Sequence, residues 1–329
     1  MKQRQLGQGG PLVGEVGFGA MSFGGFFGPT DEAASHRTLD RARDLGITHI
    51  DTALIYGPYT SEEFIGSYLR KNPEAKQQFV IATKGGIVPN PRGFDNSPAF
   101  MRQCLESSLK RLGVDYVELY YVHRRDQSVP IEDVAGTLAE MKREGKIGGF
   151  GFSEISPASL ERASKVHPVA AVQSEFSLWS RQPQLGMLQA CKRLGTTFVA
   201  FSPVARGVLT DVALDPPSLE DTDFRKKSPR FMEPNWSRNV AAIQQFKAFA
   251  KSRGWPTAAL AMAWVLRQGD HIIPIPGTRT PEHLSELAAA ASISLSDDDL
   301  RDIDRILPPG FAHDHRYSDQ QLNGTEQYC

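Results

Sequence analysis

Short apolar segments alternate with longer amphipathic segments along most of this 329-residue chain, and this alternation constrains the fold more than any other feature. We predict eight strand-then-helix units. The first predicted strand continues from an N-terminal hairpin and ends near residue 20. The other seven predicted strands span residues 48–51, 79–83, 116–122, 148–152, 170–173, 197–201 and 271–275. The predicted helices span residues 32–45, 61–70, 98–112, 131–144, 156–166, 185–194, 238–253, 257–267 and 281–289. Eight such units close naturally into a (β/α)8 barrel.

A doubly wound open sheet is the structural alternative, but this chain lacks the Gly-x-Gly-x-x-Gly turn after its first strand. We therefore predict an α/β fold in which residues 1–329 form a single TIM barrel domain. An N-terminal β-hairpin is expected at about residues 3–15, the barrel at about 16–291, and a C-terminal helix and tail at 292–329. A long polar loop is expected after the seventh strand.

Composition excludes several classes of partner. The net charge of −1 argues against a broad nucleic-acid footprint, and no apolar run reaches the length of a membrane span or a signal peptide. The cysteines Cys104, Cys191 and Cys329 are odd in number and far apart, which fits reduced thiols and offers no metal-binding spacing. We expect a cytoplasmic protein without a metal, and without a nucleic-acid or membrane partner.

Polar side chains follow the predicted strands, where an α/β barrel carries its chemistry. The second strand ends at Asp51 and its loop carries Tyr56, the third ends at Lys84, and the fourth at His123. Later strand ends place Ser153, Glu154, Gln173, Ser202, Pro203 and the Ile-Pro-Gly-Thr-Arg segment at residues 275–279. Taken singly, each residue has an ordinary interpretation as a cap, a solvated strand end or a packed turn aromatic. Together they indicate a site at the barrel mouth.

In this order the motifs resemble those of the aldo-keto reductase family. They include Met-Ser after the first strand, Asp-Thr-Ala-x-x-Tyr-Gly, Ala-Thr-Lys, His-Arg, Gly-Phe-Ser-Glu, Val-Gln-x-Glu-Phe-Ser-Leu, Ser-Pro-x-x-Arg-Gly-x-Leu-Thr and Ile-Pro-Gly-Thr-Arg. The match covers roughly residues 17–287. The Gly-Pro-Tyr-Thr-Ser-Glu-Glu and Gly-Phe-Ser-Glu variants are similar to the plant and fungal branch that holds perakine reductase.

The resemblance implies reduction of aldehydes or ketones to alcohols by hydride transfer, with Tyr56 as the general acid. A free tyrosine has a pKa of about 10 and is a poor acid at neutral pH. The resemblance therefore implies that Lys84, held by Asp51, lowers that pKa. It also implies that a neutral His123 orients the carbonyl by donating a hydrogen bond.

The resemblance further implies that NADPH or NADP+ lies across the barrel mouth. Ser153, Glu154 and Gln173 are expected at the carboxamide, with Phe201 under the nicotinamide ring. The remaining expected cofactor residues are Ser202, Pro203, Arg206, Gly207, Leu209, Gly277, Thr278, Arg279 and Glu286. Arg279 suits a 2′-phosphate, which favours NADPH over NADH. Two positions depart from many relatives, because Phe201 replaces Tyr and Leu287 replaces Asn.

The substrate pocket is expected to suit a carbonyl compound with an aromatic or apolar body. Its expected lining is Met21, Phe26, Phe27, Tyr59, Arg124 and Trp236. Phe26 and Phe27 have plain packing as an equal alternative. Arg125 either attracts anionic substrates or faces solvent.

Three readings of the function stay open. The first is the reductase, and the second is a cofactor-binding regulatory subunit of a larger complex with little turnover. The third is an aldolase that uses Lys84 as a Schiff base. The intact set of Asp51, Tyr56, Lys84 and His123 favours the first. The substrate, the oligomeric state and the role of the polar tail, which folds over the site, mediates assembly or is disordered, are undecided.

Overall fold

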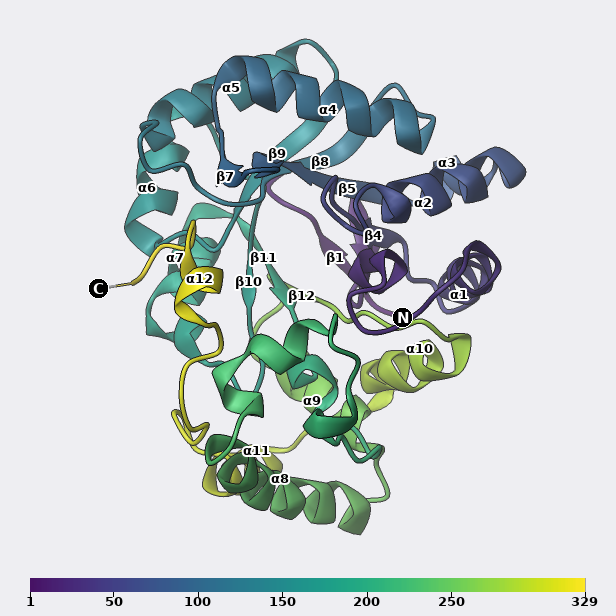
Figure 1. Cartoon of the computed structure of the whole chain (residues 1–329), viewed down its shortest axis with the longest axis vertical. Coiled ribbons are helices and arrows are strands. Elements are labelled where there is room, and N and C mark those ends of the chain that lie inside the picture. Colours follow the sequence, from purple (N-terminus) through teal and green to yellow (C-terminus); the bar gives the residue numbers. More distant parts are fainter. Residues whose placement is uncertain (329) are drawn as a thin grey trace.

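A computed structural model describes residues 1–328 and confirms the predicted barrel (Figure 1). Within these residues, eight parallel strands form one sheet in the order β3-β4-β5-β8-β9-β10-β11-β12. The strands are β3 (Phe18–Gly19), β4 (His49–Asp51), β5 (Val80–Gly85), β8 (Val117–Val122), β9 (Ile147–Ser153), β10 (Ala171–Glu175), β11 (Thr197–Phe201) and β12 (Ile272–Ile275). Backbone N–H groups of Gly17 and Gly19 donate to the carbonyls of Pro274 and Pro276 at 2.9 Å, which joins the last strand to the first.

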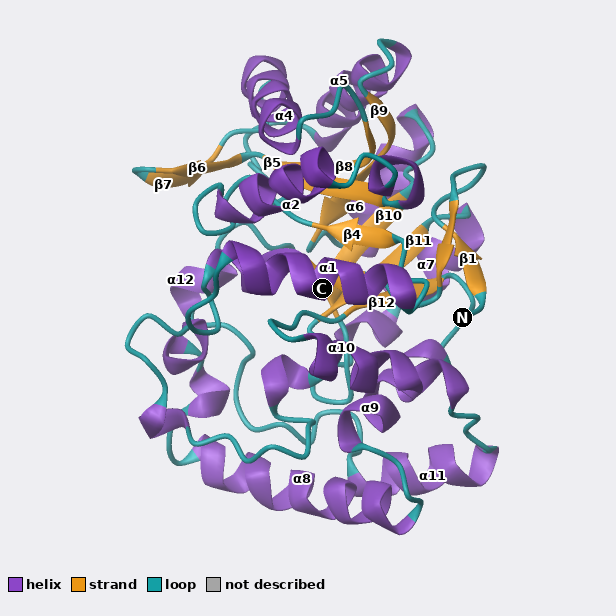
Figure 2. Ribbon diagram, turned by 90° about the vertical axis from the view of Figure 1, so that its right-hand side faces the viewer, coloured by secondary structure: helices purple, strands orange, loops and turns teal. Residues whose placement is uncertain are grey.

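Helices surround these strands, as Figure 2 shows. Those that follow successive barrel strands are α1 (Glu32–Asp44), α2 (Thr60–Lys71), α4 (Pro98–Leu112), α5 (Ile131–Arg143), α6 (Pro157–Val166), α7 (Met187–Leu194), α9 (Thr257–Leu266) and α10 (Pro281–Ala288). Side-chain caps help to set their starts, because Asp31 accepts from the N–H of Ala34 at 2.7 Å and Ser97 accepts from the N–H of Phe100 at 3.3 Å. The predicted bounds agree with these elements to within a few residues.

The additional helices are α8 (Asn235–Ser252), α11 (Asp297–Ile306), and the short α3 (Ala75–Gln78) and α12 (Asp319–Leu322). Every residue of α9 is buried, because α8 packs against its outer side and the sheet against its inner side. This explains why the sequence of α9 is apolar throughout and has no polar face.

The apolar core has two layers. Inside the barrel, an inner cluster contains Ala82, Leu119, Tyr121, Ala171, Val199 and Ile273. A larger outer cluster fills the space between the strands and the helices, with Phe152, Phe198 and Trp264 fully or almost fully buried. Strand residues alternate between these layers because successive side chains point to opposite faces of a sheet.

The predicted N-terminal hairpin covers the amino end of the barrel. Its strands β1 (Gln3–Gln5) and β2 (Leu12–Gly14) pair antiparallel. Leu6 and Val13 join the inner cluster, and Nη1 of Arg4 donates to the carbonyl of Gly269 at 2.7 Å. In Figure 2 this hairpin lies on the opposite side from β6, β7 and α12. The open end of the barrel is therefore the carboxyl end of its strands.

A second hairpin borders that open end and was not predicted. Strands β6 (Ile87–Pro89) and β7 (Arg92–Phe94) pair antiparallel within a segment that we expected to be a loop between strand and helix. The long loop after β11 is present, but it folds into short 3₁₀ helices that include η5 (Phe224–Lys227) and η6 (Pro229–Phe231). The β6–β7 hairpin and the loop after β11 both lie at the barrel mouth, where they contribute to the lining of the site.

Three further observations concern the described residues as a whole. Among residues 1–328, no helix combines the length and the apolar character that crossing a membrane requires. In the same residues, no three His, Cys, Asp or Glu side chains converge as metal ligands. Cys104 and Cys191 are buried free thiols, and Cys329 lies outside the described residues.

Candidate active site

The four residues expected to carry the chemistry lie together at the carboxyl ends of three neighbouring strands. Asp51 is the last residue of β4, Lys84 lies near the end of β5, and His123 directly follows β8. Lys84 is fully buried and forms an ion pair with Asp51. Its Nζ also donates to the Oη of Tyr56 at 3.4 Å. The Tyr56 ring meets the His123 ring edge-on, with 5.7 Å between the ring centroids.

Burial dominates the proton affinities of these groups. It raises the pKa of Tyr56, and the nearby Lys84 ammonium opposes this rise without reversing it. Lys84 therefore acts on the Tyr56 pKa in the expected direction, and desolvation outweighs this single positive charge. Burial would lower the pKa of Lys84, but Asp51 and Tyr56 together raise it. Burial also lowers the pKa of His123 well below its usual range. At neutral pH the phenol is protonated, the amine charged and the imidazole neutral.

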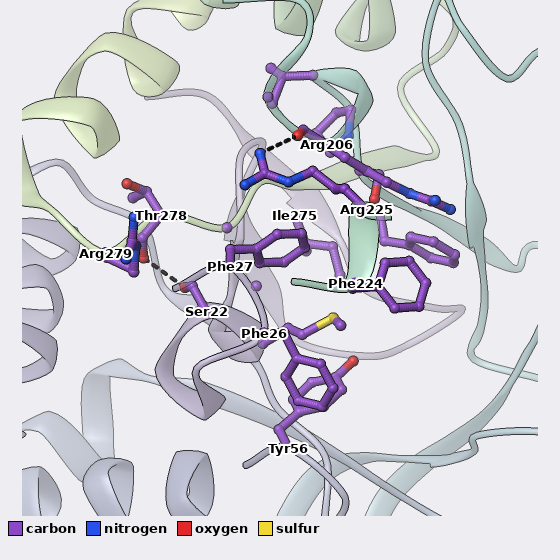
Figure 3. A pocket seen from close by; sticks show the side chains of 18 of the residues that line it. Ser22, Phe26, Phe27, Tyr56, Arg206, Phe224, Arg225, Ile275, Thr278 and Arg279 are labelled. Carbon is purple, nitrogen blue, oxygen red and sulfur yellow. Dashed lines mark hydrogen bonds between the residues drawn. The ribbon is translucent and has the colours of Figure 1, made fainter. Parts of the chain in front are cut away.

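A cavity of about 810 Å³ occupies the barrel mouth (Figure 3). Tyr56, Arg206 and Arg279 lie on different sides of it. The expected site residues that line it are Asp51, Tyr56, His123, Ser153, Gln173, Phe201, Ser202, Pro203, Arg206, Gly207, Gly277, Thr278, Arg279, Glu286, Met21, Phe26, Phe27 and Arg124. Lys84 stands behind this lining, where it reaches the site through Asp51 and Tyr56.

Leu209, Tyr59 and Trp236 were also expected at the site and do not line the cavity. Leu209 is fully buried in the outer core cluster, behind the loop whose backbone faces the cavity. Tyr59 packs beneath the guanidinium of Arg111, 4.6 Å from its ring centroid. Trp236, the second residue of α8, stacks on Phe231 with 5.6 Å between ring centroids. Each aromatic ring is held by a neighbour that sequence spacing did not reveal.

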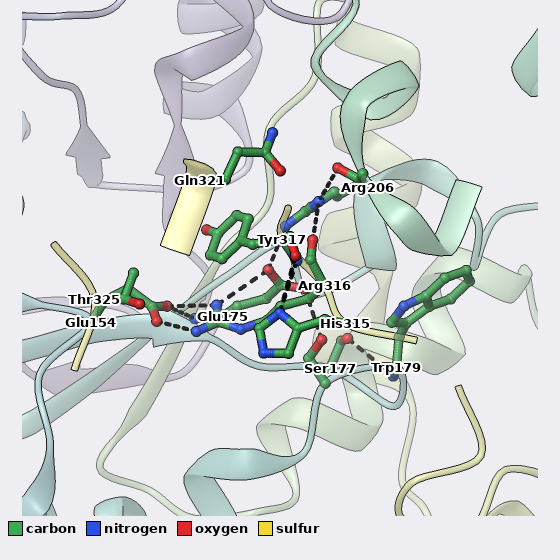
Figure 4. A network of polar contacts seen from close by, with 12 residues as sticks. Glu154, Glu175, Ser177, Trp179, Arg206, His315, Arg316, Tyr317, Gln321 and Thr325 are labelled. Carbon is green, nitrogen blue, oxygen red and sulfur yellow. Dashed lines mark hydrogen bonds and ion pairs between the residues drawn. The ribbon is translucent and has the colours of Figure 1, made fainter. Parts of the chain in front are cut away.

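Glu154 also lies outside the cavity, and its expected contact with a carboxamide does not fit its surroundings. It forms an ion pair with Arg316 from the C-terminal tail (Figure 4). Arg316 also contacts Glu175 at 3.5 Å, and Glu175 pairs with Arg206 at 2.7 Å. We call Glu154, Glu175, Arg206, Arg230 and Arg316 the tail cluster. Its contacts occupy the carboxylate of Glu154.

The polar groups at the floor of the cavity bond to one another. Nε2 of Gln173 donates to Oδ2 of Asp51 at 2.8 Å, and Oγ of Ser153 accepts from Nη1 of Arg124 at 3.0 Å. The half-buried ring of Phe201, at the end of β11, lies beside them in the lining. The amide of Gln173 retains its carbonyl oxygen and a second N–H for a ligand.

Guanidinium groups line other parts of the cavity. Arg206, Arg225 and Arg279 all contribute to the lining. Arg279 precedes α10 and its Nη1 donates to the carbonyl of Pro29 at 2.9 Å. The Arg225 guanidinium lies over the ring of Phe27 at 5.5 Å, so the loops after β3 and β11 meet above the cavity. Arg206 is paired with Glu175 and Arg225 with Asp223, both at 2.7 Å. Arg279 lies just before the start of α10, where its positive charge favours an anionic ligand.

Glu286 gives separate evidence that the cavity binds a ligand. Its side chain lines the cavity, and within residues 1–328 its buried Oε1 has no hydrogen-bond partner. Burial raises the pKa of this carboxyl group. Buried polar atoms are nearly always paired, so an amino group of a bound ligand fits this position. Leu287 lines the cavity beside it and offers no hydrogen bond.

Several lining residues were missed by sequence reasoning. Ile87 and Arg92 come from the unpredicted hairpin, whose Asn-Pro turn between two short segments was the available signal. Tyr317, Gln321 and Asn323 come from the tail. No hydrophobic period marks the tail, so its course over the site was one of three options. Among those options, the structure shows the tail folded over the site.

One family model and several known proteins are similar to this chain over most of its length. The model of the Aldo/keto reductase family matches residues 15–308. The chain is 37% identical to a protein of Schizosaccharomyces pombe named aldo-keto reductase yakc, with NADP(+) in its name, over 90% of this chain and 88% of that protein. It is 38% identical to the probable aldo-keto reductase 1 of Glycine max, over 98% of this chain and 93% of that protein.

Solved structures give the same picture. The glycerol dehydrogenase AKR11B4 from Gluconobacter oxydans superposes with a TM-score of 0.83 at 30% sequence identity, covering 93% of this chain and 94% of that one. The holo form of aldo-keto reductase AKR11C1 from Bacillus halodurans gives a TM-score of 0.77 at 25% identity, covering 96% and 99%.

Proposed function

This chain belongs to the aldo/keto reductase family, and on that premise we propose that it reduces aldehydes or ketones to alcohols with Tyr56 as the proton donor. As a family member it is an NADP-dependent oxidoreductase. One observation carries the proposal for Tyr56: its buried phenol touches the ammonium of Lys84 and faces a neutral His123 at the floor of a large cavity.

Each residue has a distinct task in this proposal. NADPH, when bound, supplies the hydride that reduces the carbonyl carbon. Tyr56 gives its proton to the carbonyl oxygen, on which negative charge develops. Lys84 stabilises the phenolate that remains, and Asp51 balances the charge of Lys84 in the buried site. His123 donates one hydrogen bond from its neutral ring to the carbonyl oxygen and so orients it.

The lining residues suit the cofactor along its length. We assign the carboxamide to Ser153 and Gln173 and the ring face to Phe201, and we leave Glu154 out because Arg316 holds it. We assign the pyrophosphate to Ser202, Pro203, Arg206, Gly207, Gly277 and Thr278. Arg279 is proposed for the 2′-phosphate, because a guanidinium fork matches phosphate geometry. The unpartnered Glu286 is proposed for the adenine amino group.

We also propose that residues 1–329 act as one functional unit. The N-terminal hairpin covers the amino end of the barrel, and the C-terminal tail contributes lining at the carboxyl end. Removal of either segment is expected to impair the activity of the barrel between them.

The test follows the absorbance of NADPH with an activated aromatic aldehyde, for the wild type and for Tyr56→Phe. Loss of the general acid is expected to lower kcat by about 10²- to 10⁴-fold, while NADPH still binds. Tyr116→Phe is the matched control, because Tyr116 lies just before β8, at the amino end of the barrel, and is expected to keep full activity. Undiminished turnover in Tyr56→Phe would remove Tyr56 from its role. Bound NADPH without turnover of any carbonyl in the wild type would favour a regulatory subunit.

A further inference from the structure

Two arginines line the cavity near Tyr56 and have no carboxylate partner. Arg92 belongs to β7, and Arg124 directly follows His123. Within residues 1–328, neither guanidinium lies within ion-pair distance of an acidic side chain. Arg125, the next residue, differs because it is buried and pairs with Glu326 at 3.4 Å. The charges of Arg92 and Arg124 are therefore available to a ligand.

The backbone and one hydroxyl hold Arg124 in place without neutralising it. Its Nη1 donates to the carbonyl of His123 at 2.7 Å and to Oγ of Ser153 at 3.0 Å. In the described part of the chain, its other guanidinium N–H groups have no acceptor. A guanidinium fixed by one nitrogen presents the remaining fork in a defined direction.

Arg92 and Arg124 line the same cavity as Tyr56 and His123, and Arg124 adjoins His123 in the chain. Burial first lowers the pKa of His123, and the charges of Arg124, Lys84 and Arg92 lower it further. Arg124 also acts to lower the pKa of Tyr56. Arg92 and Arg124 thus add positive charge to the cavity in which we place the carbonyl.

The acidic residues of the cavity do not offset these charges. Asp51 is paired with Lys84. Asp31 caps α1 beside the loop that Arg279 contacts, and Asp211 and Glu286 interact near α10. The cavity lining also includes an apolar wall of Phe26, Ile55 and Ile87, and the Phe26 ring lies 6.0 Å from the Tyr56 ring.

We propose that the substrate is a carbonyl compound that carries a carboxylate group, which Arg92 and Arg124 bind. The inference rests on the proposed reductase activity and names its substrate class. The carbonyl lies between Tyr56 and His123, the carbon body packs on the apolar wall, and the carboxylate reaches the two guanidiniums. Charged hydrogen bonds of this kind are the stronger class in proteins.

The experiment compares 3-carboxybenzaldehyde with methyl 3-formylbenzoate, its neutral ester, at saturating NADPH. Wild type is expected to favour the acid in kcat/KM by about 10-fold or more, and added salt is expected to reduce this preference. Arg92→Gln and Arg124→Gln are each expected to lower it. Arg92→Gln is the cleaner variant, since none of its contacts support His123 or Ser153. Arg143→Gln, on the exposed side of α5, removes the same charge elsewhere and is expected to leave the preference intact.

A binding measurement separates this inference from the proposed function. Calorimetry with benzene-1,3-dicarboxylate, which cannot be reduced, tests the arginines without turnover. Equal use of acid and ester by the wild type overturns the carboxylate inference and leaves the reductase intact. Failure of both aldehydes, together with dicarboxylate binding that Arg92→Gln weakens, supports the anion site and counts against the reductase. Failure of both aldehydes without dicarboxylate binding overturns both.

Discussion

Two groups of buried charge stand at the barrel mouth and differ in how they are built. Asp51 and Lys84 pair one to one across the adjacent strands β4 and β5, with a phenol beside them. The tail cluster instead pairs two carboxylates with two guanidiniums, Arg206 and Arg316, and Arg316 comes from the far end of the chain. The first group lies on strands of the barrel itself. The second is complete only when the tail brings Arg316 across the mouth, so we assign chemistry to the first and closure to the second.

The largest expected effect is in the first group. Lys84→Met leaves Asp51 buried without its counter-charge, and breaking a buried pair from one side costs about 3–5 kcal/mol of unfolding free energy. Turnover is expected to fall as well, by about 10²-fold or more, since Tyr56 loses its ammonium. Denaturant unfolding and NADPH oxidation measure the two losses. If Lys84→Met were as stable as the wild type, this would contradict the role of Lys84 in balancing the charge of Asp51.

The double variant Asp51→Asn with Lys84→Met separates stability from catalysis at this site. Removing both charges of a buried pair is often close to neutral for stability. We therefore expect the double variant to recover most of the unfolding free energy and none of the activity. Recovery of both would mean that the pair is not needed for the reaction.

The tail cluster is expected to make the stability of the fold depend on pH in acid. Burial alone would raise the pKa of Glu175, but Arg206, Arg316 and Arg230 lower it from 4.5 to about 2. Because the folded pKa is the lower one, this stabilisation is complete above pH 4.5 and is lost as the pH falls toward 2. The loss is expected to be roughly 3 kcal/mol across that window.

Urea unfolding at pH 5, 4 and 3 follows this loss, with Glu175→Gln as the comparison. The variant is expected to be less stable at neutral pH and to show a shallower decline with acid, since it lacks the titrating group. Matching slopes for the two proteins would place the acid sensitivity elsewhere.

A smaller effect is expected when the tail alone is loosened. Arg316→Met removes the partner of Glu154, while Glu175 keeps Arg206. Tyr317 and its neighbours then line the cavity less tightly. We expect KM for the aldehyde to rise about five-fold, the equivalent of roughly 1 kcal/mol, with kcat little changed. Arg316→Lys is expected to restore part of the affinity. A fall in kcat with unchanged KM would argue that the tail acts in the chemical step.

The two groups also mark what sequence could and could not predict. Strand ends place Asp51, Lys84 and His123 reliably, because a parallel barrel aligns those ends whatever the loops do. The net rise in the Tyr56 pKa was not predictable, since it depends on how completely the phenol is desolvated. The pairing of Glu154 with Arg316 had no signal in the sequence, because the two residues lie 162 positions apart and Arg316 belongs to a tail without periodicity.

Insertions account for most of the remaining differences. The hairpin that carries Arg92 lies within a strand-to-helix connection. Its sequence contains turn residues, which do not indicate strands. Trp236 was expected in the pocket as part of the loop segment 224–237, but that loop folds into short helices and α8 begins at Asn235, early enough to include Trp236. Side chains on such loops are placed by tertiary contacts, which local patterns do not encode.

The position of Arg316 has a consequence during synthesis of the chain. A ribosome makes Glu154 and Glu175 long before Arg316, and at about 5–20 residues per second the interval from Glu154 is roughly 10–30 s. In the later part of that interval, after Arg206 has been made, the nascent chain holds both carboxylates with Arg206 and without Arg316. Final closure of the mouth therefore waits for the last part of the chain to leave the ribosome, and until then the growing enzyme keeps its catalytic end accessible to solvent and to chaperones.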